Sequence, residues 1–116
     1  MSRAYLKHCP LWITIEPMPT IRTTDVFDHW FDRLRDLRTR VRIQARIDRL
    51  ATGNPGDHKS VGGGVNELRI DLGPGYRVYY TQSGAVLVIL LCGGNKSTQQ
   101  ADIDRAKALA ANLDTD

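Results

Sequence analysis

The sequence contains little that would hold a chain together through covalent or metal bonds. Its two cysteines, Cys9 and Cys92, lie far apart, which fits neither a metal knuckle nor a redox pair. We therefore expect two reduced thiols in a cytoplasmic protein. The longest apolar run, from Ala85 to Cys92, is far shorter than the ~20 residues of a membrane-spanning helix. No pattern of a zinc hydrolase, a nucleotide enzyme or a Ser-His-Asp site is present, so we expect no metal and no cofactor.

The acidic residues are nearly all aspartate, and the basic residues are mostly arginine. Glutamate occurs only twice, at Glu16 and Glu67, which leaves little room for a mechanism based on paired carboxylates. The formal net charge is +3, and 12 of the 16 basic residues are arginines. Arginine presents a planar fork of donors that suits phosphate and carboxylate groups. The composition therefore fits a nucleic-acid or acidic-protein partner, although a GC-rich genome would give the same arginine content.

Length and composition predict one globular domain. The chain has 116 residues, of which 41% are hydrophobic and 25% charged, as in an ordinary folded domain. Residues 1–19 are set apart as an N-terminal extension, and residues 20–116 form the domain. Translation from Met18 would remove most of this extension, whereas Leu11–Ile15 would otherwise form an extra edge strand. The apolar stretch in the extension is too short for a secretory signal.

Two helices are predicted after a short strand at Thr20–Thr23. Thr24 is a suitable N-cap for the first helix, and acidic residues follow in the first turn. Apolar residues recur at helical spacing over about 25–36 and again over about 38–52. Gly53-Asn54-Pro55-Gly56 ends the second helix. Two helices joined this closely form an αα-hairpin.

Strands and turns are predicted in the second half, because all ten glycines lie between residues 53 and 94. Residues 66–72 and 76–81 alternate between apolar and polar, and residues 86–91 are apolar on both faces, as in a central strand. Ser97 and Gln100 have the spacing of a capping box for a last helix over about 98–112. The order predicts an α+β fold, with the helical hairpin on one face of a small antiparallel sheet and a C-terminal helix.

A polar face is predicted on the side of the sheet away from the hairpin. On adjacent antiparallel strands such side chains lie within ~5–8 Å of one another. Two arginines and a tyrosine on one face can bind a phosphodiester and stack a base. A solvated face with internal ion pairs fits the same pattern. The residues are Glu67, Arg69, Asp71, Arg77 and Tyr79.

Basic residues gather in two further places. His58 and Lys59 precede the Gly62-Gly63-Gly64 loop, and Lys96 follows Gly93-Gly94. Lysine beside other cations and histidine near neutral pH can both move protons, although ordinary loop residues would look the same. The triple glycine is not a P-loop, since no GK[ST] follows it.

An arginine stripe follows one face of the second predicted helix, at spacings of 4, 4 and 3 residues. Such a stripe fits contact with an acidic partner, with RNA or with solvent only. It consists of Arg38, Arg42, Arg46 and Arg49.

Three segments between Asp25 and Leu113 carry a family resemblance. They are FDHWFDRLRDLRTRVRIQARIDRL, GNPGDHKSVGGGVNELRIDLGPGYRVYY and LLCGGNKSTQQADIDRAKAL. They resemble the RelE/ParE toxin superfamily, specifically its phage-derived, HigB-like addiction-module killer proteins. The resemblance implies the toxin of a type II toxin–antitoxin module, paired with a helix-turn-helix antitoxin. RelE-like members are ribosome-dependent endoribonucleases (mRNA interferases) that cut mRNA without metal, by attack of an RNA 2′-OH on the adjacent phosphate.

The resemblance also implies roles for single residues. Arg69 in NELRID matches a strand arginine that stabilises the phosphate, and Arg77 in GYRVYY matches a second basic position. His58 or Lys59 lies where the family has basic residues before the sheet, and is the candidate base. Lys96 lies near the C-terminal catalytic position, where several RelE proteins have a tyrosine. Tyr79 stacks a base in this scheme, with a core or antitoxin contact as the alternative.

Two other functions fit the same scaffold. A ParE-like protein would inhibit DNA gyrase without chemistry of its own, and an inactive module would only bind its antitoxin. The proton-transfer candidates Lys59 and Lys96 favour the endoribonuclease. In each case we expect the antitoxin to cover a basic face that includes the arginine stripe.

Overall fold

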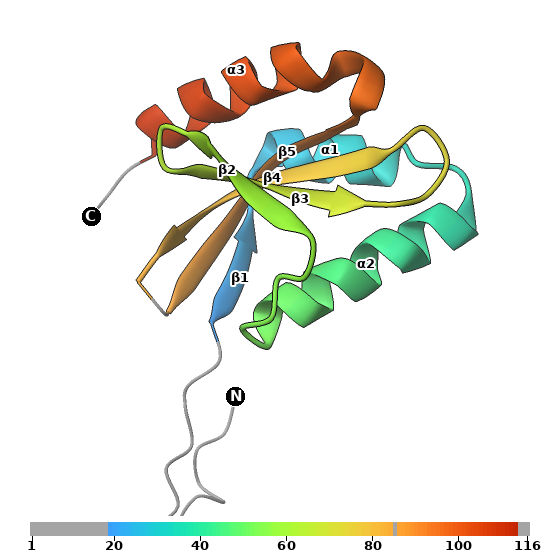
Figure 1. Cartoon of the computed structure of the whole chain (residues 1–116), viewed down its shortest axis with the longest axis horizontal. Coiled ribbons are helices and arrows are strands. Elements are labelled where there is room, and N and C mark those ends of the chain that lie inside the picture. The colour runs from blue at the N-terminus through green and yellow to red at the C-terminus, as the bar shows by residue number, and fades with distance from the viewer. Residues whose placement is uncertain (1–18, 85, 114–116) are drawn as a thin grey trace, which may run out of the picture.

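The computed structural model describes residues 19–84 and 86–113. The expectations for the N-terminal extension, a start at Met18 or a strand at Leu11–Ile15, lie outside the described residues. The elements, shown in Figure 1, are β1 (Thr20–Thr23), α1 (Asp25–Asp32), α2 (Leu37–Ala51), β2 (His58–Gly62), β3 (Val65–Ile70), β4 (Tyr76–Ser83), β5 (Leu87–Asn95), the 3₁₀ helix η2 (Lys96–Thr98) and α3 (Gln99–Ala111).

The strands form one mixed five-stranded sheet in the order β1-β5-β4-β3-β2. The pair β1–β5 is parallel, and the other pairs are antiparallel. This confirms the predicted α+β class, but the sheet has one strand more than expected. Residues 57–59 read as a turn before the triple-glycine loop, but in the structure His58–Gly62 forms the strand β2. Its residues are mostly exposed, and the segment becomes a strand by hydrogen bonding to β3 at the sheet edge.

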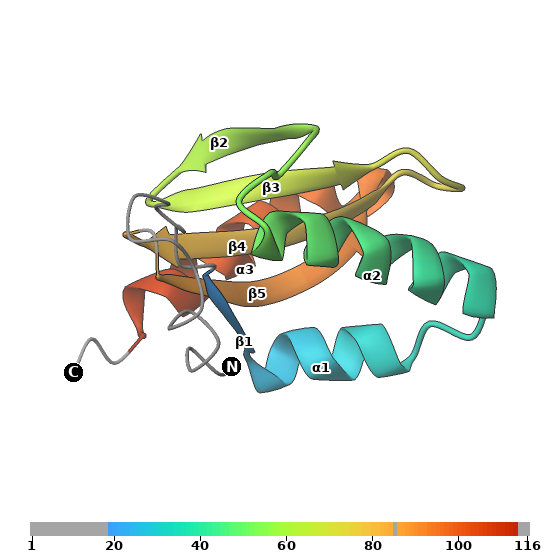
Figure 2. The same ribbon diagram turned by 90° about the horizontal axis from the view of Figure 1, so that it is seen from below.

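Helices cover both faces of the sheet. The predicted hairpin of α1 and α2 lies on one face, and α3 lies on the other (Figures 1 and 2). Phe27 and Ile43 of the hairpin pack on Leu68 and Val78 of the sheet, while Ala106 of α3 packs on Leu91 and Tyr79. β5 contributes to both cores, which confirms a central strand covered on both sides. None of the described helices has the length and apolar character needed to cross a membrane.

The start of α1 follows the prediction, whereas the end of α1 and the start of α3 differ from it. The Thr24 side chain accepts a hydrogen bond from the Phe27 N–H (3.1 Å), as expected of an N-cap. The predicted capping box of Ser97 and Gln100 is wrong. Asn95 caps instead, with Thr98 as its partner, because a 3₁₀ turn intervenes before α3 begins at Gln99. The first helix also ends at Asp32, four residues earlier than predicted.

Two adjacent glycines in β5 let helices approach the sheet from both sides. A Cβ added to Gly93 would lie 2.3 Å from Cε3 of Trp30 in α1. A Cβ added to Gly94 would lie 1.8 Å from Oδ2 of Asp102 in α3. At Gly93 a side chain would collide with the indole ring of Trp30, whereas at Gly94 it would require the Asp102 carboxylate to move away. The Gly-Gly pair therefore sets how closely α1 and α3 pack on β5.

Candidate functional site

Three basic side chains surround one open cavity at the end of strands β3 and β4. Arg69 and Arg77 are direct register partners across these antiparallel strands, so their side chains leave the same face. Lys96 lies beside them at the start of η2. The cavity has a volume of about 490 Å³. Its lining is Asp57, Arg69, Ile70, Asp71, Gly73, Pro74, Gly75, Arg77 and Lys96.

The turn between β3 and β4 fixes the position of two of these cations. The Arg77 guanidinium donates through Nη1 to the carbonyl oxygens of Gly75 (3.1 Å) and Tyr76 (3.3 Å). The backbone N–H of Lys96 donates to the Pro74 carbonyl oxygen (3.4 Å). Asn95 holds the η2 turn, since its side chain accepts from the Ser97 N–H (2.9 Å). The cavity is therefore built on hydrogen-bonded backbone rather than on a free loop.

A fully buried carboxylate, Glu67, lies beneath the two arginines. The Arg69 Nε donates to Glu67 Oε1 (3.2 Å), and the Arg77 Nε lies 3.8 Å from Oε2. Oε2 also accepts from the Tyr79 hydroxyl (3.1 Å) and from Nε2 of Gln99 in α3 (2.7 Å). The side chain of Arg69 is 35% exposed and that of Arg77 is 13% exposed. Glu67 thus holds the Nε of Arg69 and lies beside the Nε of Arg77, while the turn holds the Arg77 Nη1, and both arginines line the cavity.

The predicted polar face is therefore not an open one. Glu67 and Tyr79 are completely buried, because α3 covers this part of the sheet. Burial and the neighbouring Glu67 carboxylate raise the pKa of the Tyr79 phenol above its ordinary range. A ring in this position does not present a face to an RNA base, so the expected stacking role for Tyr79 is replaced by the alternative core contact.

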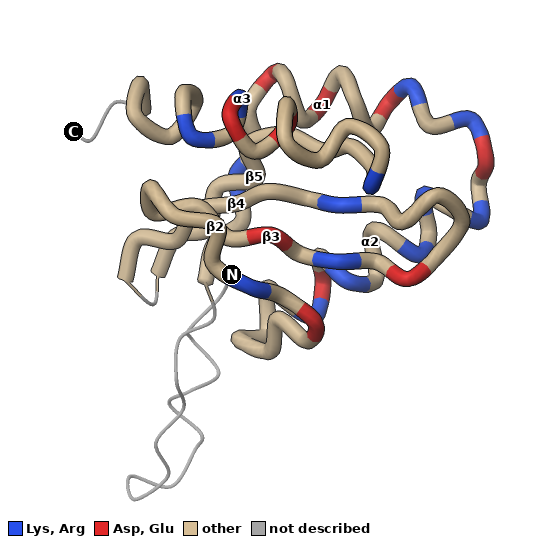
Figure 3. Tube along the Cα trace, turned by 45° about the horizontal axis from the view of Figure 1, so that its top comes forward, with Lys and Arg blue, Asp and Glu red and all other residues tan. Residues whose placement is uncertain are grey.

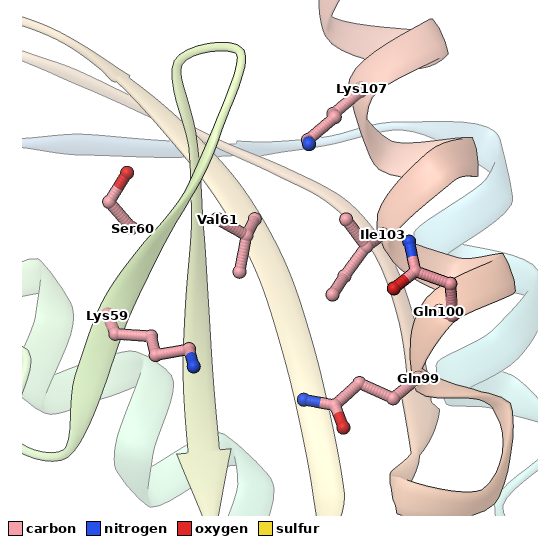
Figure 4. A pocket seen from close by; sticks show the side chains of 7 residues that line it. All are labelled: Lys59, Ser60, Val61, Gln99, Gln100, Ile103 and Lys107. Carbon is pink, nitrogen blue, oxygen red and sulfur yellow. The ribbon is translucent and has the colours of Figure 1, made fainter.

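The candidate bases His58 and Lys59 do not lie in this cavity. His58 is the register partner of Leu68, so it leaves the hairpin face of the sheet, opposite Arg69 and Arg77. Its Nδ1 lies 2.8 Å from the Gly56 carbonyl oxygen. Lys59 pairs with Glu67, so its side chain lies on the same face of the sheet as Arg69 and Arg77. It lines a different cavity, however, which lies against α3 and is shown in Figure 4.

The arginine stripe on α2 is divided by its contacts. Arg38, Arg42 and Arg49 are exposed. Arg46 is not a free surface residue: its guanidinium donates to the carbonyl oxygens of Pro55 (2.8 Å), Asp57 (3.2 Å) and Arg69. It ties α2 to the end of β3 and to the turn before β2. Figure 3 shows the basic positions on α2 and on the neighbouring strands β3 and β4.

Two residues that help to form the site, Asp57 and Gln99, were not predicted from the sequence as site residues. The Asp57 carbonyl oxygen accepts from the Arg69 N–H (3.0 Å), and its residue lines the cavity. Gln99 reaches Glu67 from a different element. Neither contact has a local sequence signal, because each depends on how α3 and the segment before β2 pack on the sheet. Within residues 19–84 and 86–113, no three His, Cys, Asp or Glu side chains are grouped so as to hold a metal ion.

Cys92 is expected to be chemically inert in the native protein. Burial, with a contribution from Asp102, raises the pKa of its thiol to about 12, and the thiol donates to the Asp102 carbonyl oxygen (3.6 Å). Between pH 9 and 12 the unfolded thiol ionises and the native one does not. The contribution of the Cys92 thiol to the free energy of unfolding is therefore fully present below pH 9. Between pH 9 and 12 it falls by about 1.4 kcal/mol per pH unit.

The measurement is urea unfolding of a Cys9→Ser chain between pH 8 and 11, beside the same chain carrying Cys92→Ala. The stability of the alanine variant should fall less steeply with pH. A disulfide reagent at pH 8 should label Cys92 only as fast as the chain unfolds. Labelling of Cys92 at the rate of a free thiol, without unfolding, would contradict the assignment.

The chain was compared with known proteins. The family model described as "Phage derived protein Gp49-like (DUF891)" matches residues 29–113. An uncharacterized protein of Haemophilus influenzae is 58% identical over 93 residues, which cover 80% of this chain and 94% of that protein. The range that the family model matches spans both arginines of the cavity, Lys96, Glu67 and the Gly-Gly pair. The chain therefore belongs to the Gp49-like family of phage-derived proteins, a toxin-like family related to RelE/ParE-type addiction modules.

Proposed function

We propose that the protein is the toxin of a type II toxin–antitoxin module and acts as a ribosome-dependent, metal-independent mRNA endoribonuclease. The observation that supports this most directly is the cavity lined by Arg69, Arg77 and Lys96. Three cations around one open space of about 490 Å³ suit a phosphodiester, whose charge increases in the transition state. Family membership supports the toxin assignment.

The proposed reaction is an internal transesterification of RNA. The 2′-oxygen forms a bond to the adjacent phosphorus, the bond from phosphorus to the 5′-oxygen breaks, and the products are a 2′,3′-cyclic phosphate and a 5′-hydroxyl. Arg69 stabilises the charge on the non-bridging oxygens, because it is the more exposed of the two arginines and Glu67 fixes its Nε. Arg77 shapes the cavity and adds positive charge. Lys96 donates the proton to the leaving 5′-oxygen.

The proton acceptor is proposed among the carboxylates of the cavity. Asp57 and Asp71 both line it, and a carboxylate can accept the proton of a 2′-OH. His58 lies on the other face, and Lys59 belongs to the second cavity. We therefore prefer an aspartate to either of the bases suggested by the family resemblance.

The antitoxin is proposed to bind the exposed part of α2. Leu37 is 71% exposed and Val41 is 59% exposed, and they lie one helical turn apart beside Arg38 and Arg42. An exposed apolar pair flanked by arginines suits an acidic, amphipathic segment of a helix-turn-helix antitoxin. Arg49 extends the same basic surface.

The test of the nuclease is a map of RNA 5′ ends after brief expression of the chain without antitoxin. New ends within translated messages are expected for the wild type. The variant Arg69→Ala/Lys96→Ala should reduce them by about 100-fold or more, since a single charge-stabilising donor is commonly worth that factor. The matched control, Arg22→Ala/Arg33→Ala, removes two exposed arginines outside the cavity and should cleave like the wild type.

The other outcomes separate the competing functions. Growth arrest with intact messages would contradict the nuclease and indicate gyrase or another protein target. Normal growth with intact messages, and with soluble protein present, would indicate a module that only binds its antitoxin.

A further inference from the structure

A second cavity lies between the edge strand β2 and the first turns of α3 (Figure 4). Its volume is about 470 Å³. Two lysines, Lys59 and Lys107, and two amides, Gln99 and Gln100, line it together with the apolar side chains of Val61 and Ile103. Among the residues that the structure describes, none of those that line it is acidic. The cavity therefore differs from the first one, which contains two aspartates, and it is suited to an anion.

The triple glycine of the β2–β3 turn seats one of these lysines. A Cβ on Gly63 would lie 3.2 Å from Cγ of Lys107, and a Cβ on Gly62 would lie 3.4 Å from its Nζ. The aliphatic part of Lys107 thus packs along bare backbone, and the residue is half-buried. Both glycines have a positive φ, 92° at Gly62 and 62° at Gly63, and residues that carry a side chain rarely adopt such angles. Packing on this turn restricts Lys107 and places its ammonium at the cavity.

The buried Glu67 carboxylate is hydrogen-bonded to one lining residue of each cavity. Gln99, which lines the second cavity, donates to Glu67 Oε2 (2.7 Å). Arg69, which lines the first, donates to Glu67 Oε1 (3.2 Å). The buried carboxylate therefore links one lining residue of each cavity, which places the two cavities on the same face of the sheet.

We propose that the β2–α3 cavity binds a second phosphate of a single-stranded RNA, next to the phosphate that is cleaved. Lys59 and Lys107 neutralise this phosphate, and Val61 and Ile103 form an apolar surface for the attached nucleoside. The proposal rests on the proposed function, because it takes the Arg69–Arg77 cavity as the place of the scissile phosphate. It assigns Lys59 to substrate binding rather than to proton transfer.

The test measures binding without cleavage. The probe is a fluorescent 12-nucleotide single-stranded RNA with 2′-O-methyl groups, which lacks the attacking hydroxyl. Its affinity is measured by fluorescence anisotropy between 50 and 300 mM salt. Each phosphate contact to a single strand contributes about −0.7 to the slope of log K against log salt. Because both lysines are proposed to neutralise the same phosphate, Lys59→Gln/Lys107→Gln should reduce the steepness of that slope by about 0.7 and weaken binding at 50 mM salt roughly tenfold or more.

The matched control is Arg22→Gln/Arg33→Gln, which removes the same net charge at exposed positions that line neither of these two cavities. It should keep the wild-type slope. If both variants lost the same amount of slope, the effect would come from net charge alone and the subsite would be overturned. Absence of binding by the wild-type protein at 50 mM salt would also overturn the subsite. If messages are cleaved in cells but the lysine variant keeps the wild-type slope, the subsite fails and the nuclease stands. If the slope falls selectively but no message is cleaved, RNA binding at this cavity stands and the nuclease fails.

Discussion

Glu67→Ala is expected to lower the free energy of unfolding by about 3–5 kcal/mol, which is the usual cost of removing one partner from a buried ion pair. The carboxylate is completely buried. It accepts hydrogen bonds from Arg69, Tyr79 and Gln99 and forms an ion pair with Arg77. Its loss leaves the nearly buried Arg77 guanidinium without a counter-charge and the Tyr79 hydroxyl without an acceptor. Thermal and urea unfolding followed by circular dichroism give the difference, which corresponds to roughly 15–30 °C in a domain of this size.

Two further variants locate the cause of this loss. Tyr79→Phe removes only one of the hydrogen bonds to Glu67 and should cost about 1 kcal/mol. Asp71→Ala removes an exposed carboxylate nearby and should change stability by less than about 0.5 kcal/mol. If Glu67→Ala were no less stable than Asp71→Ala, the buried carboxylate would not hold the arginines in the way described.

Gly93→Ala is expected to destabilise the fold by about 2–3 kcal/mol, near the upper end of what overpacking costs. The new methyl group would meet Trp30 at 2.3 Å from Cε3 and 2.4 Å from Cζ3, so the indole and α1 with it must move away from β5. Because the Trp30 ring lies tilted against Phe27, with centroids 5.7 Å apart, the displacement spreads into the hairpin core. Urea unfolding with an unchanged m-value measures the loss.

A double-mutant cycle with Trp30→Leu gives the control. The smaller side chain vacates part of the space that the new methyl group needs, so Gly93→Ala should cost at least about 1 kcal/mol less in that background. The same effect on stability in both backgrounds would show that the clash with Trp30 is not the cause.

Periodicity predicted most of the fold because each helix and each buried strand has one clear apolar face. The apolar faces predicted over residues 25–36, 38–52 and 66–72 do pack in the core, through Phe27, Ile43 and Leu68 among others, and the side chain of Thr24 indicated its role as a cap. The strand β2 was missed because an exposed edge strand has no apolar face to detect. Its conformation comes from hydrogen bonds to β3, and those partners are not visible in the segment itself.

The candidate site was predicted in part for the same reason. Arg69 and Arg77 were expected on one face, and the register of β3 with β4 brings them together. Glu67 has the same alternation as an exposed residue, and only the packing of α3 buries it. His58 and Lys59 are neighbours in β2, and because that strand was not predicted, their placement on opposite faces of the sheet could not be predicted either.

The parallel pairing of β1 with β5 has a consequence for how the chain folds. Thr24 caps α1 and also donates through its hydroxyl to the Leu91 carbonyl oxygen, across a sequence separation of 67 residues. Closing so long a loop is slow, since its entropic cost precedes the contacts that compensate for it. During synthesis, β1 and the start of α1 therefore cannot form their native contacts until β5 has left the ribosome. Residues 20–32 therefore reach their native position only after β5 has been made.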